Sequence, residues 1–109
     1  MHITSLDAAS PYDQERFVAE ELLDGSHSNV RVIRLTSGQA LPPHTHGESD
    51  LMLYAVEGVG TLDTADGPVD FPAGSLAHLR GSEELRIANR GLEGLTLLAF
   101  LSPQFPPRS

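Results

Sequence analysis

Apolar residues recur along the chain in short runs of the length that β-strands adopt. In the segments 29–36 and 84–88, apolar and charged residues alternate. A period of two is typical of a strand with one buried face. The segments 51–57 and 95–101 are almost continuously apolar. Such runs predict strands that are buried on both faces.

Turn-forming residues separate these runs. The chain contains 10 glycines and 8 prolines, which recur throughout its second half and do not gather in a linker. Asp66-Gly67, between the segments 60–64 and 69–71, is typical of a hairpin turn. Another turn, at 72–74, precedes a strand predicted at 75–80. The pattern predicts one all-β domain of about eight short strands.

The two ends of the chain follow this pattern less closely. Residues 13–23 fit a helix by the spacing of Phe17, Val18 and Leu22, but they also fit a strand that leads into the turn at 24–26. Residues 102–109 form a proline-rich tail, which cannot join a central strand because proline lacks the backbone N–H. We therefore expect one domain over 1–109, with its core at about 29–101.

Composition excludes several classes of function. A chain of 109 residues can bury a hydrophobic core without disulfides or structural metals. The absence of cysteine excludes disulfides and thiolate chemistry, and the absence of lysine excludes Schiff-base chemistry. A net charge of −8 argues against nucleic acid as a partner. We expect no membrane partner and a cytoplasmic location, since neither a long apolar run nor a signal peptide is visible.

The candidate chemistry lies in the segment 38–50. His44 and His46 are one residue apart, so on an extended strand their rings point to the same side. Two neutral imidazoles on one face can bind a divalent metal ion. Acidic residues at Glu48 and Asp50 could complete such a site or orient a ring. The alternative is a surface loop with two solvated histidines.

The spacing of these residues resembles that of a known superfamily. Gly38, His44, His46, Leu51 and Gly58 resemble the first motif of the cupins. The segment 74–81, with Glu84 and Asn89 after it, resembles a degenerate second motif. The resemblance implies a double-stranded antiparallel β-barrel (a jelly roll) with a ligand pocket inside, and usually a homodimer. It also favours a strand within the ambiguous segment 17–23.

The resemblance implies a metal site of three histidines and one glutamate, which this chain matches only in part. His44 and His46 match the first two positions. The glutamate position falls on Leu51 or on Asp50, which face opposite ways, and Leu51 is the favoured inward residue. The third histidine is replaced, which leaves His78 or Glu84 as the third ligand. Fe, Mn, Ni, Zn and Cu all suit such ligands, and two histidines with Glu84 suit non-haem iron and oxygen.

Other side chains are candidates for the pocket. We expect Leu51, Leu53 and Tyr54 to line it. Three arginines (31, 34 and 86) alternate with apolar residues and are expected to face outward. The alternative is that one of them enters the barrel and binds a substrate carboxylate through a bidentate pair.

Three functions follow from the sequence. The first is a metal-dependent enzyme, such as an oxygenase (an oxidoreductase), an isomerase or a cyclase, that acts on a small organic substrate. The second is a non-catalytic module that binds or senses a small molecule and needs no metal. The third is a chain that has lost its metal site and serves in oligomeric packing. The incomplete metal motif favours the second and third, whereas the retained histidine pair favours the first.

Overall fold

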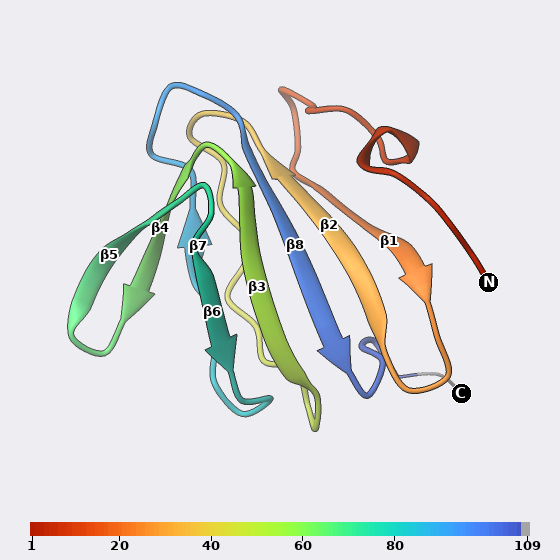
Figure 1. Ribbon diagram of the computed structural model, residues 1–109. Coiled ribbons are helices and arrows are strands. Elements are labelled where there is room, and N and C mark those ends of the chain that lie inside the picture. The colour runs from red at the N-terminus through yellow and green to blue at the C-terminus, as the bar shows by residue number, and fades with distance from the viewer. Residues whose placement is uncertain (108–109) are drawn as a thin grey trace.

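The strands of the protein form two antiparallel sheets (Figure 1). A computed structural model describes residues 1–107, in which a short 3-10 helix (Leu6–Ala8) precedes eight strands. The strands are β1 (Val18–Asp24), β2 (Asn29–Leu35), β3 (Asp50–Glu57), β4 (Val59–Thr64), β5 (Gly67–Pro72), β6 (Leu76–Leu79), β7 (Ile87–Ala88) and β8 (Leu95–Ser102). No helix within residues 1–107 has the length and apolar character needed to cross a membrane.

The larger sheet has the strand order β1-β2-β8-β3-β6, and the smaller has the order β5-β4-β7. In Figure 1 the larger sheet extends from β1 at the right to β6, and the smaller sheet lies at the left. The hairpin predicted around Asp66-Gly67 joins β4 to β5, with Thr64 paired to Gly67. Other neighbours, such as β2 and β8 or β3 and β8, are distant in the sequence, as is typical of a jelly roll.

The core lies between the sheets and is built mainly from β3 and β8. Their inward residues are Leu51, Leu53, Ala55, Leu95, Leu97, Ala99 and Leu101. The prediction that both strands are buried on both faces is wrong. Met52 on β3 is 50% exposed and Phe100 on β8 is 38% exposed. An antiparallel sheet can leave one face to solvent, and here that face carries apolar side chains as well.

The ambiguous segment 17–23 contains a strand, β1, and not a helix, with Phe17 just before the strand. β1 pairs antiparallel with β2 from Val18 opposite Arg34 to Asp24 opposite Asn29, with an irregularity between Glu21 and Leu23. β7 is shorter than the predicted strand at 84–88 because residues before Ile87 lie in a loop.

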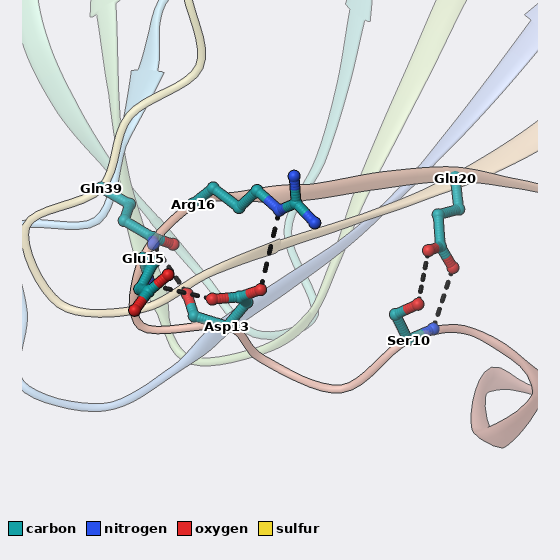
Figure 2. Close-up of polar contacts among 6 residues, drawn as sticks. All are labelled: Ser10, Asp13, Glu15, Arg16, Glu20 and Gln39. Atoms are coloured by element: carbon teal, nitrogen blue, oxygen red, sulfur yellow. Dashed lines mark hydrogen bonds and ion pairs between the residues drawn. The ribbon is translucent and has the colours of Figure 1, made fainter.

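The N-terminal segment lies against the larger sheet and is held by polar contacts (Figure 2). The backbone N–H and the hydroxyl of Ser10 donate hydrogen bonds of 2.9 and 2.5 Å to the carboxylate of Glu20. The side-chain amide of Gln39 donates a 2.8 Å hydrogen bond to the carbonyl of Asp13. These contacts connect residues 10–13 to β1 and to the loop after β2.

Two of the three arginines face outward, as predicted. Arg34 donates hydrogen bonds of 2.7 and 3.0 Å to the carbonyls of Ser10 and Leu6, and thereby helps to hold the N-terminal segment. Arg86 is exposed and lies 2.5 Å from Glu84 in an ion pair. Arg31 differs from both, as described below.

The C-terminal tail lies outside the strands from residue 103 and folds back over one end of the barrel, whereas Ser102, predicted as part of the tail, ends β8. The buried side-chain amide of Asn29 donates to the carbonyl of Phe105 at 2.9 Å, and its oxygen accepts from the Phe105 N–H at 3.0 Å. The Ser49 hydroxyl donates a 2.6 Å hydrogen bond to the carbonyl of Pro103. The last two residues of the predicted tail, 108–109, lie outside the described part of the chain.

Candidate functional site: a cavity with two histidines and one arginine

A cavity of about 340 Å³ lies inside the barrel, at the end that the C-terminal tail covers. Its wall comprises inward residues of β1, β2, β3 and β8, four residues of the segment 41–46, and four others: Phe17, Leu85, Phe105 and Pro106. The wall is mostly apolar, and the polar side chains that reach it are Arg31, His44 and His46. A concave, apolar cavity with a few convergent polar groups is typical of a small-molecule site.

The two histidines lie side by side, as their spacing predicted. Their ring centroids are 4.5 Å apart and their planes are inclined by 58°. Both histidines are held in place by backbone hydrogen bonds to the region of the second motif, at Gly81 and Leu85. The Leu85 N–H donates a 2.9 Å hydrogen bond to the carbonyl of His44, and the His46 N–H donates one of 2.9 Å to the carbonyl of Gly81.

The hydrogen bond of His44 determines its tautomer. Its Nδ1 lies 2.9 Å from the carbonyl oxygen of Pro42. A carbonyl oxygen only accepts, so Nδ1 must carry the proton. In the neutral ring, Nε2 then has a free lone pair and acts as an acceptor.

His46 lies deeper than its neighbour and is 4% exposed. The edge of one ring meets the face of the other where His46 contacts Phe105, with centroids 5.2 Å apart. Within residues 1–107, its Nδ1 is a buried polar atom without a hydrogen-bond partner. Burial, and then the neighbouring His44, lower the pKa of His46 from 6.5 to about 4. The ring is therefore neutral at neutral pH.

Arg31 faces the cavity, against the expectation that it points outward. It shares the inward face of β2 with Ile33, and its partner across the sheet is Ala99, another wall residue. The guanidinium donates a hydrogen bond of 3.3 Å to the carbonyl of Ala19. β2 has apolar residues on both faces, so alternation alone could not show which set lies inside.

The structure places Leu51 inside and Asp50 outside. Leu51 is fully buried and forms part of the cavity wall. Asp50 lies on the outer face of the larger sheet, where its Oδ1 is 2.9 Å from Nε2 of His78. His78 is the outward residue opposite Met52 in the pairing of β3 with β6. The structure therefore does not bring His78 to the histidine pair.

Glu84 also lies away from the cavity wall, in the ion pair with Arg86 on the surface. Of the other predicted pocket residues, Leu53 belongs to the core and not to the cavity wall. Tyr54 follows Leu53 on the strand, so its side chain takes the opposite face and leaves the predicted pocket. Residues 1–107 contain no group of three or more histidine, aspartate or glutamate side chains placed to hold a metal ion.

The donor set therefore fits two positions of a metal site and not a complete one. His44 has the feature typical of a metal ligand, since its second ring nitrogen donates to a carbonyl. His46 lacks this feature, because its Nδ1 has no hydrogen-bond partner within residues 1–107. Leu51 occupies a position at which the resemblance implied a glutamate, and Arg31 adds a positive charge to the same cavity.

The comparisons with solved structures confirm the predicted fold. TT1209 from Thermus thermophilus superposes with a TM-score of 0.84 at 22% identity, over 95% of this chain and 99% of that chain. An RmlC-like cupin from Desulfovibrio desulfuricans gives 0.81 at 24%, over 96% and 99%. A double-stranded β-helix protein from Klebsiella pneumoniae gives 0.83 at 20%, over 93% and 84%. The chain has the cupin fold, a double-stranded β-helix.

No family model and no curated protein sequence matches the chain. The fold is therefore established by structural likeness, and the function must be argued from the site. The sequence pattern missed the wall residues from the tail, Phe105 and Pro106. The proline content of the tail indicated that it lies outside the central strands, but it did not indicate that the tail covers the cavity.

Proposed function

We propose that the chain is a binding module that takes a small, largely apolar organic molecule into its barrel. The observation that carries the proposal is the cavity of about 340 Å³, whose mostly apolar wall is reached by two imidazoles and one guanidinium. Apolar walls supply affinity by removing ligand surface from water, and a few polar groups orient the ligand. The Nε2 lone pair of His44 offers an acceptor to a hydroxyl or an amide N–H.

The binding experiment uses naphthol, a neutral probe of suitable size, and isothermal titration calorimetry. We expect saturable binding to the natural chain. The variant Ala19→Phe places a ring into the cavity from β1 and should weaken binding at least about tenfold, because it fills the space the probe needs. Ala65→Phe, in the exposed turn between β4 and β5, is the matched control and should bind as the natural chain does.

Two results would contradict this proposal. One is a natural chain that binds neither naphthol nor the related amide and acid described below. The other is a folded Ala19→Phe variant that binds the probe with unchanged affinity.

A metal-dependent enzyme is the second candidate, and the histidine pair is the observation that favours it. Their rings lie together at the cavity, and His44 Nε2 has the lone pair that a metal ligand needs. A divalent ion bound there would supply Lewis-acid chemistry. In this case His44 and His46 would hold the ion, and the apolar wall would hold the substrate.

Metal analysis of protein purified without a histidine tag tests this second candidate. We expect an enzyme of this kind to carry about one ion per chain and to lose it in the double variant His44→Ala, His46→Ala. His78→Ala is the control, because that ring lies on the outer face. Metal content that the double variant retains would contradict a role of the pair as ligands.

A homodimer and a cytoplasmic location stay predictions of the sequence. Light scattering at working concentration tests the first, since the mass of one chain is 11.7 kDa. A measured mass close to that value would contradict the dimer.

A further inference from the structure

We infer that the ligand of this cavity carries one carboxylate, which Arg31 binds, on an apolar body. The inference rests on the proposed binding function and names the chemical class of its ligand: a small aromatic or aliphatic monocarboxylic acid.

The position of Arg31 is the first step. An arginine on the inward face of a strand takes a cation into an apolar surrounding, which is unfavourable unless the charge is paired. Among residues 1–107 no carboxylate lies within ion-pair distance of Arg31, and its guanidinium bonds to the Ala19 carbonyl at 3.3 Å. A guanidinium has five N–H donors in a planar fork, so donors remain for a carboxylate.

The charges around the cavity are the second step. Arg31 is the wall residue that is cationic at every pH at which the protein is folded, since a guanidinium does not lose its proton. The remaining wall side chains are apolar or imidazole, and none is acidic. The cavity thus attracts an anion to one place. A second carboxylate on the ligand would meet leucine and phenylalanine, which disfavours diacids.

The shape of the wall is the third step. Phe17 and Phe105 are wall residues from opposite ends of the chain, and both bring aromatic rings to the cavity. Leu51, Leu101 and Ala99 supply aliphatic surface. A volume of about 340 Å³ lies near the lower end of the range for organic ligands, which suits a body of one or two rings.

Glu21 lies beside Arg31 on the neighbouring strand. It is opposite Arg31 in the pairing of β1 with β2, and its carboxylate accepts a 3.0 Å hydrogen bond from the side-chain amide of Asn29. A negative charge beside the binding position weakens the affinity for an anion. Removing that charge with Glu21→Gln should therefore strengthen the binding of an acid and leave the binding of a neutral analogue unchanged.

The experiment compares naphthoate with naphthamide, which has the same shape without the charge. In the natural chain we expect naphthoate to bind at least about tenfold more tightly, the effect of a charge-assisted bidentate pair. Arg31→Met should abolish that preference, so that the two compounds bind the variant with similar affinity. Arg31→Lys keeps the positive charge but lacks the paired donors of a guanidinium, so it should retain part of the preference for naphthoate. The control is Arg86→Met, a surface arginine, which should retain all of it.

The outcomes separate the two proposals. If naphthoate, naphthamide and naphthol all fail to bind the natural chain, the proposed function fails. If naphthoate and naphthamide bind equally and Glu21→Gln and Arg31→Lys change neither affinity, the carboxylate inference is overturned while the binding function stands. The last two variants keep the inference testable should Arg31→Met not fold.

Discussion

Two histidines that the sequence offered as ligands of one site lie in opposite environments. His46 is 4% exposed, reaches the cavity wall, and within residues 1–107 has a ring nitrogen without a partner. The side chain of His78 is 48% exposed and pairs with Asp50 at 2.9 Å on the outer face of the larger sheet. His78 faces outward because of its position on β6, where side chains of neighbouring residues face opposite ways, whereas His46 lies outside the strands, between β2 and β3.

The pairing of β3 with β6 makes this explicit. Leu51 is opposite Leu79 and Leu53 is opposite Ala77, and these residues lie in or against the core. His78 lies between the two inward residues of β6 and must face outward. A histidine could reach the barrel from this strand only at the position of Ala77 or Leu79.

The two environments also differ in what they contribute to stability. An exposed ion pair is worth little, whereas a buried nitrogen without a partner is a cost. A costly polar group is typical of a functional position. The comparison therefore supports His46 as a residue of the site and His78 as a residue of the surface.

The largest effect on stability is expected at Gly81, which follows the strand of His78 and contacts the backbone of His46. Its carbonyl accepts the His46 N–H, and a Cβ atom here would lie 2.1 Å from the carbonyl oxygen of Gly47. Both contacts are with backbone atoms, which cannot rotate away as a side chain can. Gly81→Ala must therefore push the backbone around His46 and Gly47 away from Gly81. We expect the free energy of unfolding to fall by at least about 3 kcal/mol in urea denaturation. Gly91→Ala is the control, since its nearest contact would be 3.5 Å away. A loss below about 1 kcal/mol in Gly81→Ala would show that the segment can move freely.

An intermediate effect is expected from acid. Since burial lowers the pKa of His46 to about 4, the unfolded chain takes up a proton below pH 6.5 that the folded chain resists. The free energy of unfolding should therefore decrease as the pH falls from about 6.5 to about 4, by about 3 kcal/mol from this residue.

Urea denaturation of variants at several pH values isolates this contribution. His46→Gln should lose stability less steeply with acid than the natural chain, by about that amount. His78→Gln should keep the slope of the natural chain. Equal slopes in the natural chain and His46→Gln would mean that His46 protonates as easily when folded as when unfolded.

The sequence predicted the fold well because turns and alternation are local signals. The strand β8 and the hairpin at Asp66-Gly67 formed where expected. The same-side placement of His44 and His46 followed from their spacing alone. These features depend on residues close to one another in the chain.

The site was predicted less completely because it depends on which face of each strand is inside. Arg31 and Tyr54 took the faces opposite to those expected, since their strands carry apolar residues on both sides. Phe105 reaches the cavity through hydrogen bonds to Asn29, far away in the sequence. No local pattern encodes such a contact.

The smallest effect is expected at the surface pair of His78 and Asp50. Both side chains are about half exposed or more, so solvent screens the attraction and their ordering costs entropy. We expect a double-mutant cycle of His78→Gln and Asp50→Asn to give a coupling of at most about 1 kcal/mol at low salt, and less at high salt. Naphthol should bind both single variants as it binds the natural chain, because neither side chain lines the cavity. A weakened probe affinity in either variant would mean that the outer face of β3 communicates with the cavity, and the separation of the two histidines would then be incomplete.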